Sequence, residues 1–313
     1  MSSRRHKERG REVDGLLIVD KPQGASSNDV VQRAKHLFKA RKVGHTGSLD
    51  PLATGVLPLC FGEATKFSQF LLASDKTYRA RVKLGIRTDS GDADGKVMST
   101  RPVGTLDRDT VERALDRFRG EIDQVPSMFS AVKHQGQPLY KLARRGIEVE
   151  RKSRAITIYS NELVALEADE LTLEISCSKG TYVRTIVEEL GELLGCGAHV
   201  CALRRLAAGP FSEADLVTFE ELERELADGG LDALDRRLKP ISSAVRHWPA
   251  VKLSDATSYY VRQGQPVLVP HAPAEGWVQI FEADASNHPG AFLGVGEILD
   301  DGRVAPRRLV LAQ

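Results

Sequence analysis

GHTGSLDPLATG (residues 44–55) is a twelve-residue stretch that favours neither a helix nor a strand. Its three glycines, one proline and two threonines predict a tight loop with unusual backbone angles and spare hydroxyl groups. Such a loop can aim a single carboxylate, that of Asp50, into a cleft. An Asp-Pro pair also begins many ordinary turns, so the composition alone leaves a purely structural Asp50 open.

Two further segments of the chain accompany this loop. GLLIVDKPQG (residues 15–24) precedes it, and KGTYVR (residues 179–184) follows it. Together the three segments closely resemble the TruB family of tRNA pseudouridine synthases, in the same order and over nearly the whole chain. The loop aspartate is the catalytic residue of that family, so the resemblance implies that Asp50 is catalytic here.

The resemblance also implies roles for residues around Asp50. His45 is expected to fill the space beside a flipped base, and Tyr78 to stack on the uracil and help to position or deprotonate it. Arg184 is expected to pair with Asp50 and fix its orientation. Two further residues are expected to line the pocket, and three to support it: Tyr182 and Leu203, and Lys21, Pro22 and Lys66, the last near a phosphate.

These side chains also have structural interpretations that the sequence leaves open. A lone tyrosine in a strand is usually half-buried packing, and a lone histidine is usually a satisfied surface residue. Leu203 lies in ALRRL (residues 202–206) and would be assigned to the core without the resemblance.

The implied reaction needs little chemical equipment. Conversion of uridine to pseudouridine breaks the C1′–N1 bond, turns the uracil and rejoins it to the sugar through C5. The sequence contains no dinucleotide-binding fingerprint and no P-loop, which fits a reaction without a cofactor or metal. Asp50 could act as a nucleophile or as a base that removes a proton from the sugar. A uridine inside folded RNA must also be flipped out to be reached.

Composition bounds the class of protein. The 313 residues are 41% hydrophobic and 28% charged, which is typical of a globular protein of about two domains. A net charge of only +1 means that an RNA-binding surface must arise from local clusters of basic residues. No apolar run is long enough for a membrane span or a secretory signal, so we expect a cytoplasmic protein. The family suggests a monomer whose partner is the T-arm stem-loop of tRNA.

Four cysteines fit a reducing compartment. Cys196, His199 and Cys201 form the one cluster with possible metal ligands, but their spacing is wrong for the usual zinc motifs and a fourth ligand is missing. We therefore predict no metal site.

The predicted fold class is α+β. Residues 1–12 are expected to be a flexible basic arm, and residues 13–250 a pseudouridine synthase domain with a mainly antiparallel sheet and flanking helices. A thumb segment at about 126–154 mixes apolar and basic residues and resembles the mobile insertion that orders over bound RNA in the family. Residues 251–313 are expected to form a small β-barrel that resembles the PUA class of RNA-binding domains.

Local patterns predict several elements independently. Residues 78–84 alternate strictly, which predicts a strand with one face on the core and a basic outer face. Residues 106–119 have helical spacing and end at Gly120. Thr218 and Glu221 form a capping box for an acidic helix. The acidic stretch at 89–95 resembles a calcium loop but fails its register, so a turn is expected.

Two other functions compete with a pseudouridine synthase. A non-catalytic protein could bind and refold tRNA with the same cleft, although intact Asp50, Tyr78 and Arg184 argue against it. A glycosidase would need a second acid near Asp50, and the loop supplies none.

Overall fold

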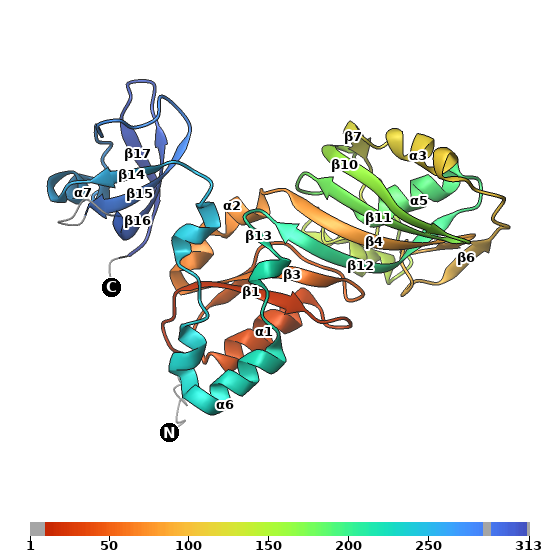
Figure 1. The fold of residues 1–313 in the computed structure, drawn as a ribbon, viewed down its shortest axis with the longest axis horizontal. Helices are drawn as coiled ribbons and strands as arrows, with labels where there is room; N and C mark the ends of the chain where they lie inside the picture. The colour runs from red at the N-terminus through yellow and green to blue at the C-terminus, as the bar shows by residue number, and fades with distance from the viewer. Residues whose placement is uncertain (1–9, 284–288, 312–313) are drawn as a thin grey trace.

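The computed structural model describes residues 10–283 and 289–311. Its larger part is built on one twisted, mixed sheet with helices against its faces (Figure 1). A second, smaller sheet lies at one end of the molecule. The strands of the large sheet are β1 (Gly15–Lys21), β2 (Val43–His45), β3 (Thr54–Phe61), β4 (Lys76–Leu84), β7 (Gly120–Gln124), β10 (Arg154–Glu167), β11 (Glu170–Cys177), β12 (Ala198–Ala208) and β13 (Phe211–Ser212).

The strand order of this sheet explains how the loop at 44–55 meets distant parts of the chain. The order is β1-β3-β12-β4-β11-β10-β7, and only the β3–β12 pair is parallel. That pair places Gly55, at the end of the loop, beside Arg205. Gly55 has φ +98°, and a Cβ there would lie 2.3 Å from the Arg205 carbonyl oxygen, so this close approach requires glycine. The mainly antiparallel sheet with flanking helices confirms the predicted fold class.

Strand β4 has the predicted alternation. Ala80, Val82 and Leu84 are buried in the main core. The predicted basic residues lie on the outer face, where Arg79 and Arg81 pair with Glu174 and Glu170 of β11 at 2.9 and 2.8 Å. The neighbouring strand therefore neutralises this face, and it is not a surface of free positive charge.

Two of the helices begin at a capping box. Ser26 and Asp29 form a capping box for α1 (Ser27–Leu37), and Thr218 and Glu221 form the predicted one for α6 (Phe219–Asp235). Helix α3 (Arg108–Asp116) is shorter than expected, because Asp107 caps it. The remaining helices are α2 (Ser68–Leu72), α4 (Leu139–Ala143), α5 (Val183–Leu193) and α7 (Asp255–Arg262). No helix in the described ranges has the length and apolar character needed to cross a membrane.

The C-terminal part of the chain forms the small sheet. Its order is β14-β15-β16-β17, with bounds Ala250–Leu253, Trp277–Ala283, Pro289–Ile298 and Val304–Leu309. Residues 267–269 (VLV) have the apolar, β-branched composition of a strand, but only Val267 bridges, to Val304. Phe292 and Trp277 pack against Phe67 and Phe70 of the larger part at 5.6 and 5.3 Å between ring centroids, so the two parts share an apolar cluster.

Two short hairpins lie outside the two main sheets, and the basic arm is anchored at Arg11. The hairpins are β5 (Ile86–Thr88) with β6 (Val97–Thr100), and β8 (Lys133–His134) with β9 (Gln137–Pro138) in the thumb. Residues 1–9 of the predicted arm lie outside the described residues. Arg11 bridges to Ala40 and pairs with Asp235 at 2.7 Å, so the arm is anchored before residue 12, earlier than we predicted.

Candidate active site

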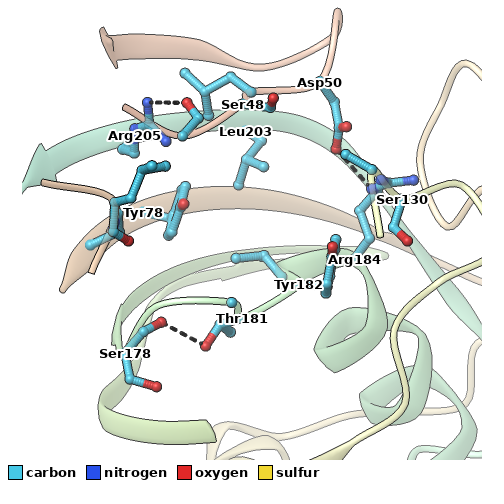
Figure 2. Close-up of a pocket in the computed structure, with 17 residues that line it drawn as sticks. Ser48, Asp50, Tyr78, Ser130, Ser178, Thr181, Tyr182, Arg184, Leu203 and Arg205 are labelled. Carbon is cyan, nitrogen blue, oxygen red and sulfur yellow. Dashed lines mark hydrogen bonds and ion pairs between the residues drawn. The ribbon is translucent and has the colours of Figure 1, made fainter. Parts of the chain in front are cut away.

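A cavity of about 280 Å³ opens beside the loop at 44–55 (Figure 2). This volume is near the lower end of the roughly 300–1,000 Å³ that small-molecule pockets have. The loop, strands β4 and β12, the start of α5 and the thumb all contribute to its wall. Five of the predicted site residues line it: Asp50, Tyr78, Tyr182, Arg184 and Leu203.

Hydrogen bonds from Lys21 hold the backbone of the Asp50 loop in place. The fully buried Lys21 ammonium donates to the carbonyl oxygens of Pro22, Pro51 and Ala53 at 3.0, 3.3 and 2.6 Å. Burial lowers the pKa of Lys21 to about 8, because the charged form loses hydration there. Three carbonyl acceptors compensate the buried charge and hold the turn on both sides of Asp50. These contacts suit the supporting role expected for Lys21 and Pro22.

Arg184 fixes the carboxylate itself. Its Nε lies 3.0 Å from Asp50 Oδ2, and its side chain is only 6% exposed. The other guanidinium nitrogens donate to the Ser90 and Phe129 carbonyl oxygens at 2.7 and 2.9 Å. A rigid guanidinium with several acceptors can orient a carboxylate closely.

The sequence did not reveal the second acid on Arg184. Asp92 Oδ2 lies 3.3 Å from Arg184 Nη1, and the Asp92 side chain is 7% exposed. We expected only a turn at 89–95, and turn composition carries no signal for a partner ninety residues further along. The fold thus supplies an acid that the loop lacks. Asp92 does not line the cavity, however, so it cannot act as the second carboxylate of a glycosidase.

The surroundings of Asp50 favour a reactive carboxylate. Enclosure by protein raises its pKa, Arg184 opposes this effect, and the negative charge of Asp92 adds to it. The side chain nevertheless keeps 40% of its surface exposed, because it faces the cavity. A carboxylate that is poorly hydrated but still accessible is suited to act as a nucleophile or as a base.

We expect the pH dependence of turnover to report this environment. If Asp50 acts as a nucleophile or as a base, its ionised form is the active one, and a raised pKa means that activity falls, as pH decreases, at a higher pH than the ordinary aspartate value of 3.8. Asp92→Asn removes the neighbouring negative charge and should move this acidic limb to lower pH. Asp94→Asn, in the same turn but exposed, should leave it in place. The measurement is kcat/KM against pH on a short RNA substrate, and a limb unaffected by Asp92→Asn would contradict the assignment.

Tyr78 and Arg205 lie on the side of the cavity away from Asp50, and Figure 2 shows Leu203 between these two residues and Asp50. Arg205 is 1% exposed and donates to the carbonyl oxygens of Val56 and Gly47 at 2.6 and 3.3 Å. Burial raises the pKa of Tyr78, and the positive charge of Arg205 opposes this. The sequence did not indicate Arg205 as a site residue, because the segment at 202–206 has the composition of a core strand.

Tyr182 is placed by a side chain of strand β7. The Gln124 amide accepts from the Tyr182 backbone N–H at 2.8 Å and donates to its carbonyl oxygen at 3.0 Å. Tyr182 caps the start of α5, so this clamp aligns Tyr182 and Arg184 at one helix end.

His45 and Lys66 do not line the cavity, and neither does Pro22. His45 Nδ1 is buried without a hydrogen-bond partner, and burial lowers the pKa of this imidazole. Lys66 pairs with Glu63 at 2.6 Å and donates to the Leu309 carbonyl oxygen at 3.3 Å. In this structure Lys66 therefore ties the C-terminal strand to the larger part.

The cysteine and histidine cluster shows no arrangement for a metal. His199 Nδ1 lies 2.9 Å from the Ile86 carbonyl oxygen. Across the described ranges, no three or more His, Cys, Asp or Glu side chains are grouped so as to hold an ion.

Comparison with known sequences identifies the class of protein. Residues 35–183 match the TruB family pseudouridylate synthase N-terminal domain, and residues 184–246 the tRNA pseudouridylate synthase B C-terminal domain. Residues 249–310 match a further C-terminal domain, described as Pseudouridine synthase II TruB, C-terminal. Sequence and fold thus define a pseudouridine synthase, an isomerase.

Relatives extend over nearly the whole chain. Proteins named tRNA pseudouridine synthase B from Pseudomonas paraeruginosa and Nitrosococcus oceani are 56% and 54% identical over 96% and 97% of this chain, and 97% of each relative is covered. A solved structure titled "Crystal Structure of a Cbf5-Nop10-Gar1 Complex" is 27% identical with a TM-score of 0.73, and the match covers 94% of this chain and 84% of that one. The chain belongs to the TruB family.

Proposed function

We propose that this pseudouridine synthase isomerises the T-loop uridine of tRNAs, at position 55, with Asp50 as the catalytic carboxylate. The observation that carries the proposal is the Asp50–Arg184 pair at 3.0 Å on the wall of a cavity that suits one base. The names of the relatives support tRNA as the substrate.

The reaction conserves the atomic composition of the nucleotide. The C1′–N1 bond breaks, the uracil turns, and C5 bonds to C1′ while the C5 proton moves to solvent and N1 gains one. Asp50 starts this sequence, either by attack on the sugar or the base, or by removal of a sugar proton. Arg184 holds the carboxylate in place, and its charge stabilises the ionised form.

The rest of the cavity wall is suited to a flipped base. Tyr78, Tyr182 and Leu203 offer aromatic and apolar surfaces, on which a uracil can stack once it has left the RNA. Ser130 and Ala131 of the thumb close another side, so thumb movement would open and close the site. A non-catalytic tRNA-binding protein would have no need of a desolvated, oriented carboxylate.

A T-arm stem-loop should be a sufficient substrate. We expect the protein to convert the uridine at position 55 of such an RNA, and to leave an anticodon-arm stem-loop of equal length unmodified. Because the two isomers have equal mass, pseudouridine mapping by mass spectrometry after a pseudouridine-specific carbodiimide modification checks both. Equal conversion of the two arms would contradict T-loop specificity while leaving the synthase activity itself intact.

The proposed mechanism assigns no step to a metal or cofactor, and it needs neither a membrane nor a protein partner. We place the protein in the cytoplasm, as a monomer that meets folded tRNA there. After exhaustive EDTA treatment, turnover of the T-arm stem-loop should stay within about twofold of that of the untreated protein. The short RNA matters because magnesium also stabilises full tRNA. Inactivation by EDTA that zinc reverses would instead indicate a metal at Cys196, His199 and Cys201.

A further inference from the structure

A second hollow, of about 820 Å³, lies beside helix α5 and shares no lining residue with the active-site cavity. Its wall combines the end of α3, strand β7, the far side of α5 and both ends of the thumb. Nothing in the proposed reaction uses this hollow.

Two buried side-chain atoms of its lining residues lack a hydrogen-bond partner, the Thr185 hydroxyl oxygen and the Arg151 Nε. Thr185 lines the hollow from the first turn of α5 and is 8% exposed, yet its hydroxyl makes no hydrogen bond. A buried hydroxyl is usually satisfied, and leaving it without a partner costs about 1–3 kcal/mol. The Thr185 hydroxyl oxygen is therefore an acceptor without a partner in the wall of the hollow.

The charge of the wall selects the sign of that ligand. Two of its arginines are already paired, Arg87 with Glu188 at 3.2 Å and Arg151 with Glu148 at 3.3 Å. The Glu189 carboxylate, one helical turn after Thr185, makes no ion pair or hydrogen bond with residues 10–283 or 289–311, and its partial burial and the nearby Glu188 raise its pKa. Acidic side chains outnumber basic ones by six to three: Asp89, Asp123, Glu148, Glu188, Glu189 and Glu192, against Arg87, Arg117 and Arg151.

The remaining wall is apolar. Val125 and Leu193 are 41% and 44% exposed, and Phe118, Ile122 and Met128 contribute further hydrocarbon surface. Exposed aliphatic groups beside carboxylates suit a methylene chain that ends in ammonium groups. Nucleic-acid phosphates would instead be repelled by the excess of carboxylates.

We propose that this hollow is a binding site for a linear aliphatic polyamine. One ammonium group pairs with Glu189 and donates a hydrogen bond to the Thr185 hydroxyl, while the methylene chain lies on Val125 and Leu193. Because a cation beside Glu189 favours its carboxylate form, binding and ionisation of Glu189 support each other.

Occupancy of the hollow would reach the active site through the thumb. Ser127 and Met128 at one end of the thumb, and Glu148 and Arg151 at the other, line the hollow. The residue after Met128, Phe129, accepts a hydrogen bond from Arg184 at 2.9 Å. A ligand that holds both thumb ends therefore restrains a segment in contact with Arg184, which positions Asp50.

Isothermal titration of the RNA-free protein with spermidine tests the proposal. Wild type should bind one equivalent, and Glu189→Gln should weaken binding at least tenfold. Thr185→Val, which keeps the shape but removes the hydroxyl, should weaken it severalfold. Glu220→Gln, the same chemical change on the exposed start of α6, is the matched control and should bind as wild type. Absence of binding, or equal weakening in Glu189→Gln and Glu220→Gln, would overturn the proposal.

Hydrogen exchange on the wild-type protein provides a second test that does not depend on a variant's folding. Spermidine should slow exchange at residues 125–128, 148–151 and 185–193, compared with sodium chloride of equal ionic strength. Protection confined to other acidic regions, such as residues 220–235, would show nonspecific binding and would contradict the site.

Discussion

Asp50→Asn is expected to abolish pseudouridine formation while leaving tRNA binding within a few-fold of wild type. The change is nearly isosteric and removes only the charge that performs the chemistry. The loop should keep its conformation, because Lys21 holds it through backbone carbonyls and Arg184 retains Asp92 as a partner. The measurements are single-turnover rates on a T-arm stem-loop and binding by filter retention.

Asp94→Asn serves as the control for this experiment. Asp94 is exposed and belongs to the turn that carries Asp92, so its neutralisation should leave turnover close to wild type. Residual turnover of Asp50→Asn above about one per cent of wild type, a barrier increase of less than about 2.7 kcal/mol, would remove Asp50 from the central role.

Arg184→Gln should affect both stability and turnover. The substitution leaves two neighbouring carboxylates, Asp50 and the 7% exposed Asp92, without their shared cation. Removal of one partner from a buried ion pair typically lowers the free energy of unfolding by about 3–5 kcal/mol. Turnover should fall at least a hundredfold, because Asp50 loses its orientation and a larger fraction of it is protonated. Urea denaturation and single-turnover kinetics measure the two effects.

An exposed pair provides the comparison for Arg184→Gln. Arg237 pairs with Glu225, and its side chain is 50% exposed, so Arg237→Gln should cost less than about 1 kcal/mol. Adding Asp92→Asn to Arg184→Gln should restore part of the lost stability, since it removes one uncompensated charge. Stability unchanged in Arg184→Gln, or lowered further by the added substitution, would contradict a buried charge network.

The site was predictable where its signal is local in the sequence. The loop at 44–55 and KGTYVR at 179–184 each carry a recognisable pattern, and the fold brings Asp50 and Arg184 into contact. Strand β4 was predictable because burial on one face imposes a two-residue period. Thr218 and Glu221 gave the start of α6, because capping side chains bond to backbone only three residues away.

Other features depend on contacts between distant segments. Asp92 resembles any turn aspartate until the fold places it on Arg184, and Arg205 resembles a core-strand neighbour until the parallel β3–β12 pair buries it beside the loop. The basic face of β4 is present as predicted, but the sequence did not show that Glu174 and Glu170 of β11 neutralise it. The stretch at 267–269 has the composition of a strand, but only Val267 makes a bridge.

Mapping of every uridine in an unmodified full-length tRNA transcript tests the central claim most directly. After incubation with wild-type protein, we expect pseudouridine at position 55 alone, in stoichiometric yield, and none after incubation with Asp50→Asn that binds the same transcript. Pseudouridine at position 55 formed equally by both proteins, or wild type that binds the transcript and modifies no uridine, would contradict the account.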